Sequence, residues 1–223
     1  MWRDSLLVAG KDLRIELRSR VVLHQVVPVA AVILVLFAFA LGPDRAPLLS
    51  AAPGLFWVAV LFATVLAVQR SFGIESADGA RDGLRVSGLD PAGVFLGKAA
   101  AVAVQLIALE LVLTGGVLLL YGAHVRAVGP LVAAGVAGTA GLAAAGTLYG
   151  ALAAGLRVRE TLLPFLLLPV AAPVLLAGTR AWQGAMGLGG VGSVSSWTGL
   201  LVVFAAVYLA LGVVISGPLQ EAP

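Results

Sequence analysis

The sequence contains no cysteine and only two histidines. Without cysteine the chain cannot form a disulfide scaffold, a cysteine-ligated zinc or iron–sulfur site, a thiol nucleophile or a C-x-x-C-H haem attachment. His24 and His124 stand alone, and a lone histidine is more often a tolerated polar residue than a ligand. No Ser-His-Asp set or carboxylate–histidine cluster stands out either. We therefore predict no metal site and no catalytic site in this chain.

Charge is also scarce. Only 14 Lys and Arg and 11 Asp and Glu occur among 223 residues, whereas 61% of the residues are hydrophobic and the mean hydropathy is +1.07. A soluble domain carries about a quarter charged residues, so this composition excludes one. The 28 glycines follow no G-x-y period, which excludes a collagen-like chain. The composition predicts an all-α, polytopic membrane protein.

Six apolar runs are long enough to cross a bilayer, because a transmembrane helix needs about 20 apolar residues. They cover Val21–Leu41, Leu48–Val68, Ala99–Tyr121, Val128–Leu156, Leu162–Gly178 and Trp197–Ile215. Placing the basic-rich segments inside puts 11 of the 14 Lys and Arg on the cytoplasmic side. We therefore expect a six-helix transmembrane domain over residues 21–217, with both termini in the cytoplasm and no cleavable signal peptide.

Residues 1–20 are predicted to form a different kind of helix, lying along the cytoplasmic membrane surface. Its basic residues Lys11, Arg14 and Arg18 share one side. The opposite, apolar face contains Trp2, Leu6, Ala9, Gly10, Leu13 and Leu17. Such a helix serves either as an orientation anchor near anionic headgroups or as a docking surface for a cytoplasmic partner.

Two of the predicted spans have unusual interiors. The fourth is rich in glycine and places Gly146 and Gly150 in G-x-x-x-G spacing, which lets helix backbones approach closely in lipid. This span is expected to pack inside the bundle. The fifth contains Pro164, Pro169 and Pro173, each of which removes a helix hydrogen bond. We expect a bent or broken helix there, with the prolines as candidates for kinks or gating.

The stretch from Arg70 to Lys98 is the main polar segment between spans, and it holds four of the eleven acidic residues. Three of them, Glu75, Asp78 and Asp82, follow a three-and-four spacing that places them on one face of a short helix. Asp90-Pro91 is typical of a helix start, with a capping carboxylate before a proline in the first turn. This segment is either a solvated loop without a specific role or a docking element for another protein.

Glu110 is the one carboxylate deep inside a predicted span. A charge there is costly, so intramembrane acids usually face the bundle and are functional candidates. One interpretation is a role in transport or at a subunit interface. The other is a protonated glutamate hydrogen-bonded to a neighbouring helix, with Gln105 as a candidate partner.

The sequence lacks a nucleotide-binding motif of the form G-x-x-x-x-G-K-[S/T]. Lys98 follows Gly97, but Ala92 occupies the position of the first glycine and Ala99 that of the Ser or Thr. Any energy from ATP must therefore come from a partner.

Several segments resemble a known family. The pattern E-x-x-D-G-x-x-D-G-L, followed by x-x-S-x-L-D-x-x-x-x-F-L-G-K, is similar to the first cytoplasmic loop of export-type ABC transporter permeases. The further segments KDLRIELRSR, GLFWVAVLFATVLAVQRSF and RETLLPFLLLPVAAPVLLAG resemble the CcmB family, the haem exporter protein B of bacterial cytochrome c maturation. The proline-rich segment is the most specific of these, because generic permeases share the loop but not that run.

The resemblance implies an export-type (ABC-2-like) permease subunit of the bacterial inner membrane, without its own ATPase. Its partners would be a cytoplasmic ABC ATPase that binds ATP, a haem-handling membrane protein, a second copy of the chain and membrane lipid, and nucleic acid is not expected. Haem would be cargo rather than a bound cofactor, released to a periplasmic chaperone. The residues implied to couple the loop to the ATPase are Glu75, Asp78, Gly79, Asp82, Gly83 and Leu84.

Two other functions stay open at this point. An ABC exporter for a drug, lipid or polysaccharide would use the same loop and would differ in its cargo. A proton-coupled carrier would use Glu110, but such carriers often show paired broken spans, and only the fifth span is rich in proline.

Overall fold

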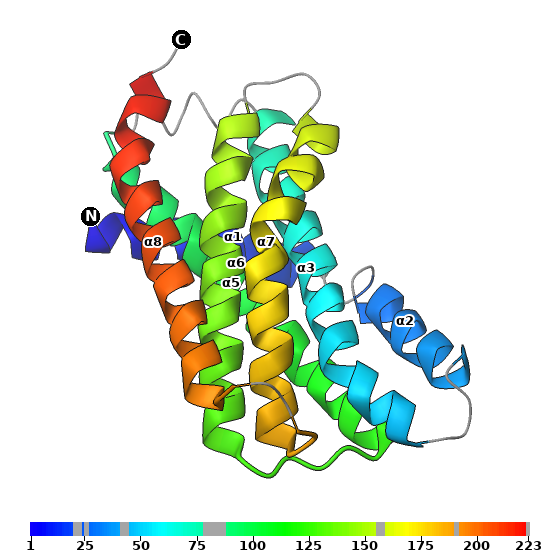
Figure 1. Cartoon of the computed structure of the whole chain (residues 1–223). Helices are drawn as coiled ribbons and strands as arrows, with labels where there is room; N and C mark the ends of the chain where they lie inside the picture. The colour runs from blue at the N-terminus through cyan, green and yellow to red at the C-terminus, as the bar shows by residue number, and fades with distance from the viewer. Residues whose placement is uncertain are drawn as a thin grey trace.

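The computed structural model describes residues 1–19, 24, 27–40, 45–77, 88–154, 159–189 and 192–221, and its regular structure is entirely helical (Figure 1). The helices of these ranges are α1 (Trp2–Ser19), α2 (Val27–Ala40), α3 (Arg45–Ala77), α5 (Pro91–Tyr121), α6 (Val128–Ala153), α7 (Arg159–Met186) and α8 (Val194–Glu221). The all-α prediction is confirmed.

Five of these helices are long and apolar enough to cross a membrane: α3, α5, α6, α7 and α8. Their apolar stretches contain 25 to 31 residues, and at about 1.5 Å per residue each exceeds the roughly 30 Å hydrocarbon core. The first predicted span coincides with α2, whose described part is only 14 residues long. The structure thus confirms a multi-span bundle but not the count of six.

Helix α6 occupies the centre of the bundle and contacts α3, α5, α7 and α8. Its glycines receive large side chains from these neighbours: Trp57 of α3 lies against Gly138, and Phe204 of α8 lies against Gly141. A Cβ at Gly150 would lie 2.6 Å from atoms of both Val68 and Phe72. The prediction that the glycine-rich span packs inside the bundle is therefore confirmed.

Helix α7 is continuous from Arg159 to Met186 and includes Pro164, Pro169 and Pro173. The sequence predicted a bent or broken helix, and of these two outcomes the break is wrong. Each proline removes one N–H donor from the helix. Packing of α7 against α3, α6 and α8 nevertheless keeps it in one piece.

Aromatic side chains fasten α7 to α3. Phe56 stacks on Trp182 with ring centroids 3.9 Å apart, and Trp57 meets both rings edge-on at 5.8 and 6.1 Å. All three side chains are fully or almost fully buried. Rings of this size contribute large contact areas, which suits an interface between membrane helices.

The glycine packing of α6 leads to a stability prediction. Gly150→Ala should lower the free energy of unfolding by about 1–3 kcal/mol, because the added methyl group overlaps Val68 and Phe72. Gly115→Ala in α5 is the matched control, since nothing lies within 4 Å of its Cβ position. That change should be neutral or stabilising by up to about 1 kcal/mol. Equal unfolding midpoints for the two variants in detergent would contradict the packing argument.

Candidate functional site

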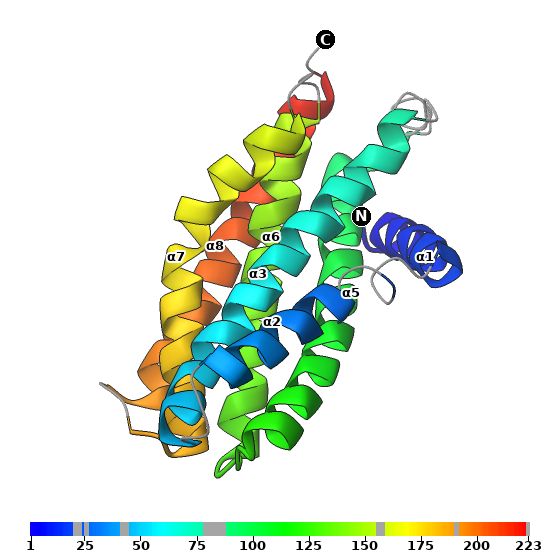
Figure 2. The same cartoon turned by 90° about the vertical axis from the view of Figure 1, so that its right-hand side faces the viewer.

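Helix α1 lies across the long helices instead of parallel to them, beside the amino-terminal half of α5 (Figures 1 and 2). Two glycines of α5 form its seat. A Cβ at Gly97 would lie 2.6 Å from the carbonyl oxygen of Ser5 and 2.8 Å from Cβ of Val8. A Cβ at Gly93 would lie 2.8 Å from the carbonyl oxygen of Met1. Only glycine at both positions allows this close approach of the two backbones.

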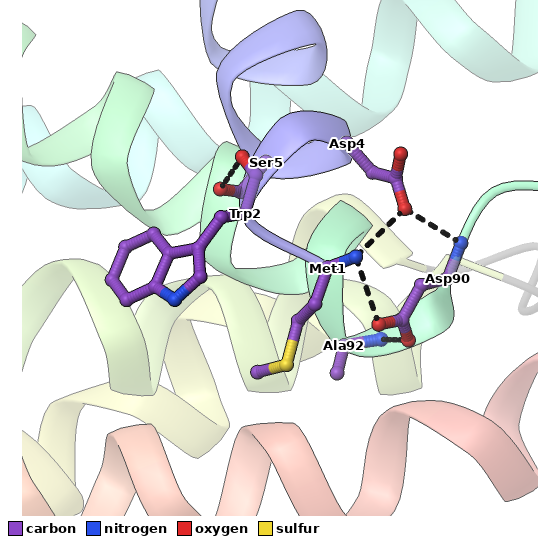
Figure 3. A network of polar contacts seen from close by, with 6 residues as sticks. All are labelled: Met1, Trp2, Asp4, Ser5, Asp90 and Ala92. Carbon is purple, nitrogen blue, oxygen red and sulfur yellow. Dashed lines mark hydrogen bonds and ion pairs between the residues drawn. The ribbon is translucent and has the colours of Figure 1, made fainter.

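The amino-terminal end of α1 is held by a polar network, which Figure 3 shows. The Met1 ammonium lies 3.1 Å from Oδ2 of Asp4 and 3.4 Å from Oδ2 of Asp90. The backbone N–H of Asp90 donates to Oδ2 of Asp4 at 3.3 Å. The hydrogen bond from the Met1 ammonium and that from the Asp90 backbone lower the pKa of Asp4.

The same network begins α5. Oδ1 of Asp90 accepts from the backbone N–H of Ala92 at 3.0 Å, and Pro91 stands in the first helical turn. The predicted cap is thus confirmed, and Asp90 joins α1 to the start of α5.

Farther along α1, a lysine from α5 reaches a carboxylate of α1. Lys98 is only 3% exposed, and its Nζ lies 3.4 Å from Oδ2 of Asp12. The ammonium also donates to Oγ of Ser71 at 3.2 Å, and that hydroxyl donates to Asp12 at 3.3 Å. The ring of Phe72 lies 4.8 Å from Nζ, close enough for a cation–π contact.

A second ion pair joins α1 to α3. Nε of Arg70 lies 3.3 Å from Oε2 of Glu16, whose side chain is 12% exposed. We refer to the five residues Asp12, Glu16, Arg70, Ser71 and Lys98 as the α1 clamp. They come from three helices, and the α1 residues supply both carboxylates.

A small cleft opens beside the clamp, between α1, α3 and α5. Besides clamp residues, it is lined by Lys11, Ile15, Ala67, Ile74 and Gln105. Its lining contains two basic and two acidic side chains, so it carries no net charge: Lys11, Arg70, Asp12 and Glu16. The cleft lies where α1 leaves the side of α5 and reaches α3.

The clamp flanks the segment that the sequence singles out for coupling. Arg70 and Ser71 precede that segment on α3, whereas Asp90 and Lys98 follow it. Helix α3 continues through Glu75, so this residue belongs to a helix, but the position of its side chain is not described. Asp78, Gly79, Asp82, Gly83 and Leu84 lie outside the described residues.

Glu110 lies at a separate place, between α5 and α6. It is 8% exposed, and the hydroxyl of Thr139 donates a hydrogen bond to its Oε1. Its other oxygen approaches the position that a Cβ would take at Gly135, at 3.4 Å. The hydrogen-bond partner is on a neighbouring helix, as one interpretation expected. It is not Gln105, which lines the cleft beside α1 instead.

The histidines and prolines complete the sequence candidates. His24 and His124 are both exposed, and His124 lies in the connection between α5 and α6. Pro164, Pro169 and Pro173 all lie on α7. The seat of α1 at Gly93 and Gly97 was missed by sequence reasoning, although its G-x-x-x-G spacing is visible there.

Comparison with known proteins places this architecture in a family. The model of the CcmB protein family matches residues 4–217, which is nearly the whole chain. The chain belongs to the CcmB family. The family is the permease subunit of an ABC transporter and is not itself catalytic, and its members are multi-pass bacterial membrane proteins.

Individual relatives agree with this assignment. The chain is 31% identical over 217 residues to heme exporter protein B of Pseudomonas aeruginosa, covering 95% of this chain and 96% of that protein. It is 32% identical to heme exporter protein B of Paracoccus denitrificans, over 77% and 78% of the two chains. The corresponding protein of Haemophilus influenzae is 29% identical over 81% of each. Membership of the CcmB family implies partnership with the ATPase CcmA.

The α1 clamp predicts a strong coupling between two residues. Asp12→Asn should lower stability by about 2–4 kcal/mol, because the buried Lys98 ammonium loses its anionic partner. Combining Asp12→Asn with Lys98→Met should cost less than the sum of the single changes, since no buried charge is then left unpaired. Thermal unfolding measures stability, and trypsin cleavage after Arg14 or Arg18 reports release of α1. Additive effects of the two single variants would contradict the clamp.

Proposed function

We propose that this CcmB-family chain is the permease of a complex in which a partner's ATP hydrolysis drives haem export, or release of haem to a periplasmic chaperone, in cytochrome c maturation. The single observation that carries the proposal is the family match over residues 4–217. A relative covered over 96% of its length is called heme exporter protein B, which supports haem as the cargo. The sequence contains no phosphate-binding motif of its own, so ATP is bound by the ATPase.

The segment from Glu75 to Leu84 is proposed to couple this permease to the ATPase. Its acidic residues Glu75, Asp78 and Asp82 would press into a basic groove of that subunit, and Gly79, Gly83 and Leu84 would shape the contact. The position of the α1 clamp supports this role. The clamp residues Arg70, Ser71 and Lys98 lie on the two helices that lead into and out of the segment.

The topology is proposed to contain six spans with both termini in the cytoplasm. The first predicted span, residues 21–41, which includes α2, would be the sixth. The hydroxyl of Tyr121 donates to the carbonyl oxygen of Leu34 at 2.7 Å, which fixes α2 against α5. The alternating directions of α3, α5, α6, α7 and α8 in Figure 1 support this arrangement. In it, α1 (within residues 1–20) is the cytoplasmic interfacial helix and residues 21–217 form the transmembrane domain.

The assembly is proposed to include a second copy of the chain, a haem-handling membrane partner and surrounding lipid. Twelve spans from two copies would form the core of such a transporter. The three prolines of α7 are proposed to give that helix the compliance needed for gating, because each removes one hydrogen bond from it.

Glu110 is proposed to join α5 to the central α6. Glu110 contacts Thr139 of the same chain. A role in the packing of two helices that support transport therefore fits this contact better than a role at a subunit interface. A buried carboxyl group that accepts a hydroxyl donor is costly to replace by an apolar group, because the donor is then left unsatisfied.

The coupling segment is tested by charge reversal. Asp78→Arg/Asp82→Arg should reduce recovery of the ATPase with the tagged permease at least about tenfold, since like charges would face each other across the contact. Glu221→Arg is the control, because it reverses an acid on the same proposed side outside the segment. Equal recovery of the ATPase from the double variant and the wild type would exclude this docking face.

Glu110 is tested by comparing two substitutions with Thr139→Val. Glu110→Gln keeps an acceptor for Thr139 and should leave stability nearly unchanged while lowering cytochrome c yield. Glu110→Ala and Thr139→Val should each lower stability by about 1–3 kcal/mol, because each leaves a buried polar group unpaired. If Glu110→Gln leaves assembly, ATPase stimulation and cytochrome c yield unchanged, the carboxyl group has no role in transport.

A further inference from the structure

At 3.6 residues per turn, the side chains of α1 fall on three faces, each covering roughly a third of the helix surface. One face packs on α5 and α3 and includes the buried residues Ser5 and Val8. The second face is apolar and exposed: Trp2, Leu6 and Leu17 are 78%, 73% and 76% accessible. The third face carries Arg3, Arg14 and Arg18, all of which are exposed.

Contacts with the rest of the protein separate the charges of α1 by sign. The three acidic residues of the helix all lie in such contacts: Asp4 with Asp90 and Met1, Asp12 with Lys98 and also with Lys11 of α1 itself, and Glu16 with Arg70. The exposed arginines point to the remaining sides. A helix with four basic and three acidic residues is nearly neutral in sequence, yet its outward surface is positive.

We propose that the outward face of α1 binds the anionic phosphodiester headgroups of a phospholipid leaflet. The exposed Trp2, Leu6 and Leu17 would insert at the boundary of the acyl chains. The adjacent arginines would then contact the phosphate groups of the headgroup layer. A cytoplasmic protein would have to cover an apolar stripe and a basic stripe together, whereas a leaflet offers both layers in that order. The proposal deepens the proposed function, because it assumes that α1 lies at the membrane surface.

The lipid selectivity depends on the clamp. If Asp12 and Glu16 were released from Lys98 and Arg70, their carboxylates would be free to neutralise the field of the neighbouring arginines. The two ion pairs therefore have two effects: they fasten α1 to the bundle, and they keep its negative charges away from the leaflet.

Trp2 provides a built-in reporter for a test. Trp57 and Trp182 are buried, so Trp197→Phe leaves Trp2 as the exposed indole. The full chain with this change is placed in phosphatidylcholine nanodiscs that contain a minor fraction of either brominated phosphatidylglycerol or brominated phosphatidylcholine. We expect brominated phosphatidylglycerol to quench Trp2 at least about twofold more strongly, and the difference to shrink in high salt.

Two matched variants assign the effect to the arginines. R3Q/R14Q/R18Q should abolish the difference between the two lipids, whereas R3K/R14K/R18K should preserve it, because lysine keeps the charge. Equal quenching by both lipids in the wild-type arginine background overturns the proposal, as does a preference that survives R3Q/R14Q/R18Q.

The failure of the proposed function would look different. If neither brominated lipid quenches Trp2, α1 does not lie at the bilayer surface, and both the interfacial placement and the lipid proposal fail. If R3Q/R14Q/R18Q loses the ATPase in a pull-down while the lipid preference is absent from the wild type, the face binds protein and the lipid proposal is overturned. If the chain prefers the anionic lipid but does not support haem-dependent cytochrome c synthesis, the lipid proposal holds and the proposed haem function fails.

Discussion

A buried ammonium group requires an anion close by, and this requirement at Lys98 organises the end of the molecule where α1 crosses α5. Lys98 is almost completely removed from solvent, and the anion that reaches it comes from α1, a helix far away in the sequence. The ion pair is worth little as net stabilisation, but leaving either charge alone is expensive. The position of α1 is therefore specified, and with it the pairing of Glu16 with Arg70 and the contact between Asp4 and Asp90.

Close backbone approach makes this pairing possible. Membrane helices gain no hydrophobic free energy from leaving lipid, so they associate where small residues bring large contact areas together. Two such uses of glycine stand out among the described residues. The glycines of α6 admit aromatic and branched side chains from its neighbours, and Gly93 and Gly97 of α5 admit the backbone of α1 itself. The first arrangement assembles the bundle, and the second sets α1 at the depth where Asp12 can reach Lys98.

The sequence predicted those features that depend on local rules. Apolar length identified the long helices, and Asp90-Pro91 identified the start of α5, because capping involves residues only two positions apart. Long-range contacts were not predictable in the same way. Asp12 and Glu16 look like ordinary polar residues of an amphipathic helix, and the partner of Glu110 proved to be Thr139 on another helix rather than the nearby Gln105. Prolines predicted a possible break in α7, but packing on several sides outweighs the lost hydrogen bonds. The coupling role of Asp78 and Asp82 stays a prediction, since these residues lie outside the described ranges.

The crossing of α1 over α5 and α3 has a mechanical consequence. A helix that is bound to two other helices limits how far those two can move apart. Helix α1 is seated on Gly97 of α5 and paired with Arg70 of α3, so it braces the two helices against each other. A brace of this kind opposes the separation of α3 from α5. A force on the ends of these two helices would therefore tilt them together instead of spreading them apart.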